Sequence, residues 1–218
     1  EFDVLVVGGG NAGCTAAIAA ARLGARVGLV ERYGFLGGTA TAAMVGPWMT
    51  YHAGTADEAG RVTGAIAQEY VERLVGMDGS PGHLPDASDY VPTITPFDPE
   101  IHKWLLMAMC EEAGVQLLLH ATFLDAILDG ARIAGVRVQT VSGPRELRAR
   151  RTIDCTADAL VSHAAGVPCE QGNADGLVQP MTMMFRLSHV DLAATAAWLR
   201  DHPDQVRTSL RPEQFSAD

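Results

Sequence analysis

A short glycine-rich turn near the start of the chain constrains the fold more than any other feature. The apolar run Val4–Val7 leads directly into glycines with the spacing Gly-x-Gly-x-x-Gly. In such a turn Gly8 permits the tight bend off a strand, and Gly10 lets a pyrophosphate approach the backbone. Gly13 lets the next helix pack closely on the sheet, with its N-terminus facing the phosphates. The candidate ligand-binding residues of the turn are Gly8, Gly10, Asn11, Ala12 and Gly13.

The residues after the turn support a dinucleotide as the ligand. A helix of small residues is predicted over Ala12–Leu23, and a second apolar strand over Arg26–Val30. Glu31 ends that strand 23 residues after Gly8. This is close to the roughly 20-residue spacing of a carboxylate that binds ribose hydroxyls. Such a carboxylate disfavours a 2′-phosphate, even with Arg32 beside it.

Composition excludes several classes of protein. The 218 residues are 48% hydrophobic and carry a net charge of −10, so a substantial core is expected. The negative charge argues against nucleic acid or an anionic membrane surface as a partner. No apolar run approaches the ~18 residues of a membrane span. The cysteines lack metal-ligand spacing and are expected as buried free thiols in a reducing cytoplasm; they are Cys14, Cys110, Cys155 and Cys169.

The middle of the chain changes from helical to strand patterns. After a glycine- and alanine-rich connection, a helix is predicted over Glu58–Val75 and a long loop over Met77–Pro99. A second helix follows over Asp98–Ala113, with proline in its first turn, and then a buried strand over Val115–Leu119. An antiparallel meander comes next, predicted over Thr122–Leu128, Arg132–Thr140 and Glu146–Arg150.

Together these elements predict an α/β fold with a Rossmann-like parallel sheet and a three-stranded meander. Arg151–Cys155 is expected as a separate strand that returns to the sheet. Gln179–Leu187 is expected as a strand, and Asp191–Leu199 as a helix. We expect a dinucleotide-binding domain over residues 1–175, with an excursion at 42–98 and the meander at about 122–150. Residues 176–218 are expected to begin a substrate domain. A nicotinamide dehydrogenase would continue as a regular β-α-β-α series, so the meander favours a flavoprotein.

Several motifs resemble the FAD-dependent oxidoreductases of the glutathione-reductase-like superfamily. Beyond the first turn, Gly34–Thr41 resembles the family's second glycine-doublet motif. Phe97–Glu100 and Glu111–Val115 resemble the helix and strand before the meander. Thr152–Asp158 resembles an Ile-Asp-Ala-Thr-Gly-Asp segment, and the match extends through Gln179–Arg186 to about residue 190.

The resemblance implies FAD as the cofactor and adds candidate binding residues. The doublet Gly37-Gly38 would approach the diphosphate and ribityl chain. The segment at Phe123 would lie along the edge of the adenine, and the strand end at Thr156 would face the phosphates. Ala157 departs from the family pattern, because it adds a methyl group where glycine allows the closest approach. The residues added by the resemblance are Gly37, Gly38, Thr39, Thr41, Phe123, Thr156 and Ala157.

The resemblance also implies a longer polypeptide. Proteins of this type usually need about twice this length to complete a substrate domain and a late Gly-Asp motif. The chain also starts at the first strand without a methionine, so an upstream segment, an export signal included, is left open. We expect an N-terminal portion of a longer protein, so tight FAD binding by this portion alone is in doubt.

Two residues are candidates for catalysis. His52 follows the glycine doublet and could serve as a general acid or base, because its ordinary pKa suits neutral pH. The alternative is an ordinary surface or hydrogen-bonded histidine. Arg186 could bind a substrate carboxylate through its planar guanidinium group, or it could be an ion-paired arginine. No metal site is expected.

Three functions remain open from the sequence. The first is an FAD-dependent enzyme that transfers two electrons with a small organic substrate, such as a carboxylic acid. The second is a non-redox dinucleotide-binding module with a regulatory or assembly role, and the third is an NAD-dependent oxidoreductase. The glycine doublet and the meander argue against the third. The sequence does not decide whether the protein forms a homo-oligomer.

Overall fold

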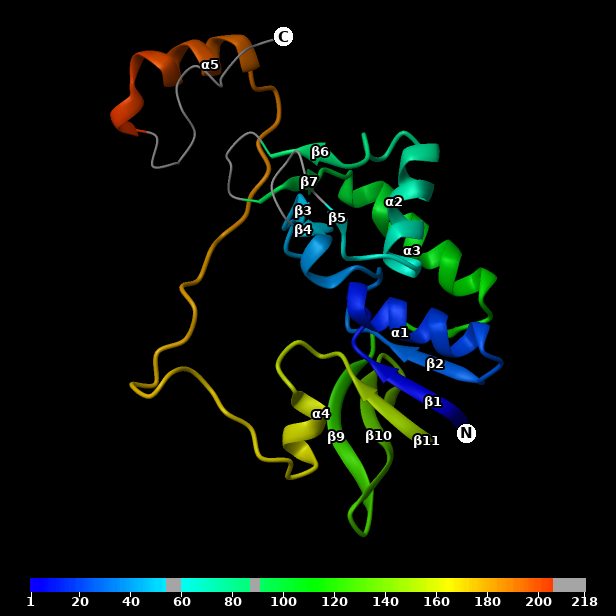
Figure 1. Ribbon diagram of the computed structural model, residues 1–218. Coiled ribbons are helices and arrows are strands. Elements are labelled where there is room, and N and C mark those ends of the chain that lie inside the picture. The colour runs from blue at the N-terminus through cyan, green and yellow to red at the C-terminus, as the bar shows by residue number, and fades with distance from the viewer. Residues whose placement is uncertain (54–59, 87–90, 206–218) are drawn as a thin grey trace.

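A computed structural model describes residues 1–53, 60–86 and 91–205 (Figure 1). Its centre is a six-stranded sheet in the order β8-β2-β1-β11-β10-β9. This arrangement confirms the predicted combination of a Rossmann-like parallel sheet with a meander. The strands are β1 (Phe2–Val7), β2 (Val27–Val30), β8 (Gln116–Leu118), β9 (Thr122–Asp129), β10 (Arg132–Thr140) and β11 (Gly143–Asp154).

The strands β8, β2, β1 and β11 form the parallel half of the sheet. β1 pairs in parallel with β2 through Val4↔Val27 to Val7↔Val30, and β2 pairs in parallel with β8. All of β2 is buried. A strand inside a parallel sheet has both faces covered, which explains its uninterrupted apolar sequence Val27–Val30.

One long strand joins the parallel half of the sheet to the meander, which corrects the prediction of two separate strands. The first part of β11 pairs antiparallel with β10, from Thr140↔Gly143 to Gly135↔Arg148. Its last part pairs in parallel with β1, from Phe2↔Ala149 to Val7↔Asp154. The charged residues in Glu146–Arg151 interrupt the apolar pattern, which suggested a break between two strands. In the structure most of these side chains are exposed, and the backbone pairing continues through them.

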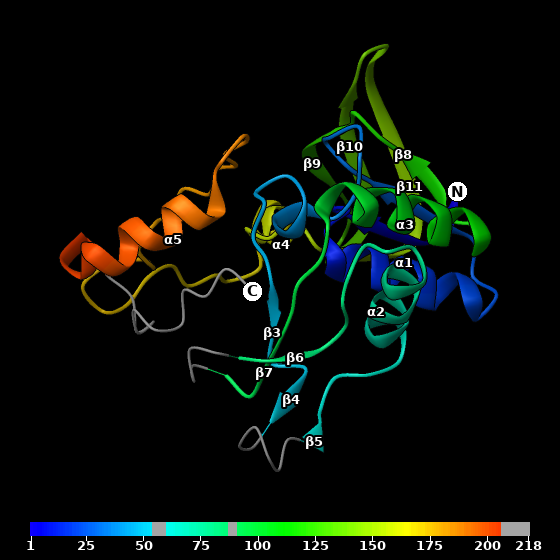
Figure 2. The same cartoon turned by 90° about the horizontal axis from the view of Figure 1, so that it is seen from above.

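Three helices cover one face of the parallel strands (Figures 1 and 2). They are α1 (Asn11–Arg22), α2 (Ile66–Gly76) and α3 (Pro99–Glu112). Asp98 caps α3, because its Oδ1 accepts hydrogen bonds from the N–H groups of Glu100 at 2.7 Å and Ile101 at 3.2 Å. α2 begins later than the predicted Glu58: residues 58 and 59 lie outside the described ranges, and Gly60–Arg61 form the short strand β5.

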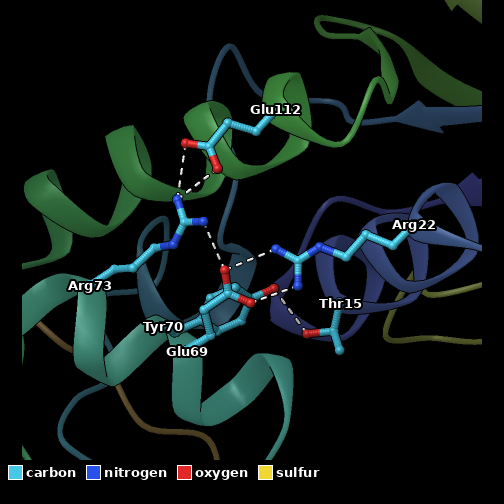
Figure 3. Close-up of polar contacts among 6 residues, drawn as sticks. All are labelled: Thr15, Arg22, Glu69, Tyr70, Arg73 and Glu112. Atoms are coloured by element: carbon cyan, nitrogen blue, oxygen red, sulfur yellow. Dashed lines mark hydrogen bonds and ion pairs between the residues drawn. The ribbon is translucent and has the colours of Figure 1, made fainter.

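A chain of ion pairs links these three helices (Figure 3). Glu69 of α2 accepts two hydrogen bonds from Arg22 of α1, at 2.6 and 2.9 Å. Arg73 also contacts Glu69, at 2.8 Å, and it binds Glu112 of α3 at 2.7 Å. Deeper between α1 and α2, the hydroxyls of Thr15 and Tyr70 are hydrogen-bonded at 3.0 Å.

The core forms two layers, one on each face of the sheet. Val6 and Leu29 pack with buried residues of α1, α2 and α3 on one face. Leu5 and Val7 point to the other face, where they pack with the meander and with Val161 of α4 (Leu160–Ala164). Alternate residues of β1 therefore serve opposite layers, as the pleat of a strand requires.

The excursion between β2 and α3 contains short strands rather than a continuous loop. β3 (Trp48–Met49), β7 (Thr93–Thr95) and β6 (Leu84–Pro85) form a small sheet, so the predicted loop over Met77–Pro99 is wrong in part. β4 (His52–Ala53) pairs with β5. Before them, Gly38–Ala40 form a short 3₁₀ turn, η1.

The segment after α4 is extended and leads to α5 (Leu192–Asp201) and the short η2 (Pro203–Gln205), well separated from the sheet (Figure 1). Asp191 caps α5 through the N–H of Ala194, which confirms this predicted helix. The predicted strand over Gln179–Leu187 is wrong, because no described strand lies beside it to supply hydrogen bonds. Cys169, predicted as buried, is exposed.

Candidate cofactor site

A cavity of about 280 Å³ lies at the carboxyl ends of β1, β2 and β11. In parallel α/β sheets this edge is where ligands bind. Five segments meet there: the ends of β1 and β2, the glycine-doublet segment, the start of the meander, and the turn after β11. The predicted cofactor residues that line it are Gly8, Gly10, Glu31, Arg32, Gly38, Thr39, Phe123, Thr156 and Ala157.

The glycines of the first turn differ in what surrounds them. Gly8 has φ +103°, and a Cβ atom there would collide with the carbonyl of Cys155. A Cβ atom on Gly13 would collide with the carbonyl of Gly8. On Gly10, by contrast, it would meet only Gly38 Cα at 3.9 Å. Gly8 and Gly13 are therefore needed by the fold, whereas the open side of Gly10 leaves space for a ligand.

The two glycine motifs pack backbone against backbone. Gly37 donates a hydrogen bond from its N–H to the carbonyl of Gly9 at 2.8 Å, and Gly37 forms a parallel bridge with Gly10. Gly38 has φ +53°, and a Cβ atom there would lie 2.9 Å from Gly10 Cα. A side chain on Gly38 would therefore push the two motifs apart, and without one this segment closes one wall of the cavity.

Glu31 is held in place beside the first turn. Its side chain is largely buried. Oε2 accepts a hydrogen bond from the N–H of Gly9 at 2.7 Å, and Oε1 accepts one from Tyr33 at 2.9 Å. A carboxylate offers about four lone-pair sites, so both oxygens retain capacity for ribose hydroxyls. This arrangement fits the adenosine end of a dinucleotide.

A row of stacked side chains begins at the wall near Glu31, where Arg32 and Tyr33 line the cavity. The guanidinium of Arg32 lies 4.9 Å from the ring centre of Tyr33, which stacks on Phe35 at 5.5 Å. Lys103 of α3 lies over the other ring at 4.3 Å. Tyr33 lines the cavity and was not predicted as a site residue. Its position directly after Glu31 and Arg32 was the available signal.

Five predicted residues do not line this cavity. Asn11 faces α3, where its Oδ1 is 2.8 Å from Nε2 of the buried His102. Thr41 is buried, and its hydroxyl donates to the carbonyl of Leu36 at 2.7 Å. These side chains support the turns from behind, and contacts with a cofactor stay predictions for them. The five are Asn11, Ala12, Gly13, Gly37 and Thr41.

A second cavity, of about 450 Å³, lies behind the glycine-doublet segment. Thr39, Ala42 and Ala43 line the first cavity, whereas Ala40 and Met44 line the second. One stretch of backbone therefore forms a wall of both. The other walls are mostly apolar, and Arg186 is the one ionisable residue among the residues that line the cavity. They are Gly46, Pro47, Ile94, Pro96, Phe97, Pro99, Phe185 and Arg186.

His52 lines neither of these two cavities. Its Nδ1 is 2.8 Å from the hydroxyl of Thr93, and its ring packs edge-on against His83 at 4.8 Å. Ile94, the next residue of β7, lines the second cavity. Because neighbouring side chains of a strand point to opposite faces, His52 lies on the face of β7 turned away from that cavity.

The described residues show neither a metal-binding cluster nor a membrane-spanning helix. In the described ranges, no three His, Cys, Asp or Glu residues are grouped so that they could hold a metal ion. None of the described helices is long and apolar enough to cross a membrane.

Comparison with known proteins identifies the family. Residues 3–217 match the model of the family "FAD dependent oxidoreductase". Digeranylgeranylglycerophospholipid reductase 1 of Methanopyrus kandleri is 33% identical over 181 residues, which are 82% of this chain and 43% of that protein. Thiamine thiazole synthase of Aeropyrum pernix is 30% identical over 172 residues, 73% of this chain and 56% of that protein. The chain thus spans about half the length of these relatives, or less.

Solved structures share the fold. THI4 of Thermovibrio ammonificans matches with a TM-score of 0.53 and 21% identity, over 75% of this chain and 61% of that one. A geranylgeranyl bacteriochlorophyll reductase-like protein of Thermoplasma acidophilum matches with a TM-score of 0.54 and 19% identity, over 76% and 42%. The family match shows that the chain belongs to the FAD dependent oxidoreductases.

Proposed function

We propose that FAD binds with its adenosine and diphosphate in the first cavity, and that the whole protein transfers two electrons between FAD and a small organic substrate. The observation that carries this proposal is the shared wall between the two cavities. A cofactor that runs along Gly38–Ala43 would extend from the first cavity toward the second. The second cavity is then the nearest place for a substrate.

FAD supplies the two-electron chemistry, and the protein supplies binding and orientation. In this proposal the backbone at Gly10 and Gly38 approaches the diphosphate, and Glu31 accepts hydrogen bonds from the ribose. The family match favours this cofactor over NAD and an enzyme over a non-redox module. Residues 1–175 would form the cofactor domain, and residues 176–218 would begin the substrate domain.

The lining of the second cavity favours a substrate with an apolar body and a carboxylate. Met44, Phe97 and Phe185 offer apolar surface, and Arg186 offers a guanidinium group at its edge. A second candidate is a polyprenyl lipid, since two relatives at 33% and 34% identity are named digeranylgeranylglycerophospholipid reductases. We assign no acid–base role to His52 in this proposal, because it faces neither cavity.

Replacing Gly10 by valine tests the cofactor site. The backbone at Gly10 has φ −68°, which any residue adopts, and the new Cβ would meet only Gly38 Cα at 3.9 Å. The fold should therefore persist while the side chain fills the space of the diphosphate. We expect FAD affinity to fall by at least about tenfold, roughly 1.4 kcal/mol. Flavin fluorescence titration of the purified protein measures the affinity, and circular dichroism checks the fold.

Gly76→Val is the matched control, because nothing lies within 4 Å of its added Cβ and it is remote from both glycine motifs in the sequence. It should bind FAD as the unaltered protein does. Equal FAD affinity in Gly10→Val and the unaltered protein would contradict the proposed site. The flavoprotein, reduced or oxidised, is then mixed anaerobically with amphipathic acids and, separately, with prenyl lipids. The class of compound that changes the flavin absorbance is the substrate class.

A further inference from the structure

We propose that Asp154 is a positioning residue for the cofactor, acting through the turn Cys155–Leu160. Asp154 does not line the cavity, but Cys155, Thr156, Ala157 and Leu160 do. Its carboxylate accepts the hydrogen bonds that hold this turn in place. The inference rests on the proposed FAD site and adds to it a residue that makes no contact with FAD.

The Oδ1 atom of Asp154 holds the first part of the turn. It accepts hydrogen bonds from the N–H of Thr156 at 3.1 Å and from the hydroxyl of Thr156 at 2.7 Å. The same hydroxyl accepts a hydrogen bond from the N–H of Leu160 at 2.9 Å. Both donors of Thr156 are thus bound to Asp154, and Thr156 links Asp154 to the start of α4.

The Oδ2 atom holds the far side of the turn. It accepts hydrogen bonds from the N–H of Ser162 at 2.9 Å and from its hydroxyl at 2.8 Å. Burial by itself would raise the pKa of Asp154, but the hydrogen bonds from Ser162 and Thr156 outweigh it and lower the pKa below the ordinary value of 3.8. The group is therefore a carboxylate at neutral pH, with acceptor capacity for all four donors.

The turn needs the hydrogen bonds to Asp154 because its backbone is strained. Ala157 has φ +72° and Ala159 has φ +53°. The left-handed region costs a residue with a Cβ atom about 1 kcal/mol or more, which surrounding contacts must offset. Ala157 lines the cavity, and within the described part of the chain its N–H donates to no acceptor. The turn thus offers the N–H of Ala157 as a free donor that a diphosphate can accept.

The charge of Asp154 allows an experiment to distinguish a positioning role from a simple electrostatic effect. Replacing it by asparagine removes one negative charge near the site of an anionic diphosphate. By Coulomb's law alone this change would strengthen FAD binding or leave it unchanged. A positioning role predicts weaker FAD binding instead, because asparagine has one acceptor oxygen and cannot receive the four hydrogen bonds.

The experiment measures the FAD dissociation constant of the purified protein by flavin fluorescence, together with the melting temperature of the FAD-free protein. We expect Asp154→Asn to raise the dissociation constant about tenfold. Ser162→Ala is a milder change that keeps the N–H donor, and it should raise the dissociation constant about threefold. This second variant keeps the test valid if Asp154→Asn does not fold. Asp158→Asn is the matched control: it lies in the same exposed turn and removes the same charge, and it should not weaken binding.

A rescue variant separates positioning from general stability. Glycine adopts φ +72° without strain, so Ala157→Gly should recover FAD affinity in the Asp154→Asn background more than it changes affinity in the unaltered protein. Equal gains in both backgrounds, or unweakened binding in both Asp154→Asn and Ser162→Ala, would overturn the inference. Failure of the unaltered protein to bind FAD would instead count against the proposed function.

Discussion

At the scale of single residues, burial separates the polar groups that serve the fold from those available to a ligand. His102 of α3 has no exposed surface, and its Nε2 is hydrogen-bonded to Asn11 at the start of α1. Its Nδ1 has no hydrogen-bond partner among the described residues. The rings of Trp48, Phe97 and Tyr70 surround it, with centres 4.9 to 5.8 Å away. His102 therefore links the first glycine turn to α3 as a neutral imidazole.

The pKa of His102 leads to a prediction on stability. Burial lowers this pKa from 6.5 to about 4 in the folded protein. Below pH 6.5 the unfolded chain binds a proton that the folded protein does not, so stability falls as the pH drops from 6.5 toward 4. We expect the difference to cost about 2 kcal/mol between pH 7.5 and pH 5.

Urea unfolding at several pH values measures this term as the difference between the unaltered protein and His102→Gln. Glutamine keeps a donor for Asn11 but does not titrate, so the pH slope should become smaller by that amount. The exposed residue His163 supplies the control, since His163→Gln should leave the slope as it is. An unchanged slope in His102→Gln would show that His102 is not the group responsible.

At the scale of elements, α1, α2 and α3 are joined through Glu69 and Arg73 of α2. The hydrogen bond from Arg22 lowers the pKa of Glu69, with further contributions from Arg73, although burial opposes the shift. The side chains are partly exposed, at 26% for Glu69 and 53% for Glu112, so water screens the pairs. Exposed pairs contribute little individually, and a shared, bidentate carboxylate contributes more than an isolated pair.

Glu69→Gln should lower the free energy of unfolding by about 1 kcal/mol, because it removes the charge that separates two arginines. The loss should shrink in ~1 M salt, where the Debye length is about 3 Å. Chemical unfolding at low and high salt measures both effects. Glu72→Gln, an exposed neighbour on the same helix, should change stability far less. A loss that is equal in both variants would mean that the network does not act as a unit.

At the scale of the whole molecule, the candidate site is an assembly of segments that the sheet brings together. The turns after β1, β2 and β11 meet because the carboxyl ends of parallel strands share one edge. The excursion then folds back over α1, so that η1 lies against the first glycine turn (Figure 1). The second cavity needs a further segment, because Phe185 and Arg186 come from the extended stretch after α4.

Arg186 supplies a prediction that belongs to the full-length enzyme. If its guanidinium binds a substrate carboxylate, Arg186→Gln should raise KM for an amphipathic acid at least about tenfold with a smaller change in kcat. Steady-state kinetics of the full-length protein with the acid and its methyl ester measure this. Arg132→Gln, on β10 and remote from the second cavity, is the control. An equal loss with the ester would argue against a carboxylate contact.

The sequence by itself determined the α/β unit at the start and the FAD-binding family. Its signals are local: the apolar run of β1, the spacing of Gly8, Gly10 and Gly13, and the carboxylate Glu31 are each read within a few tens of residues. Only the tertiary structure decided that β11 is one strand, since its two halves pair with different neighbours. It also decided which polar groups turn inward, because the direction of a side chain depends on partners distant in the sequence. The glycine turn is thus specified locally, whereas the second cavity exists only once distant segments pack together.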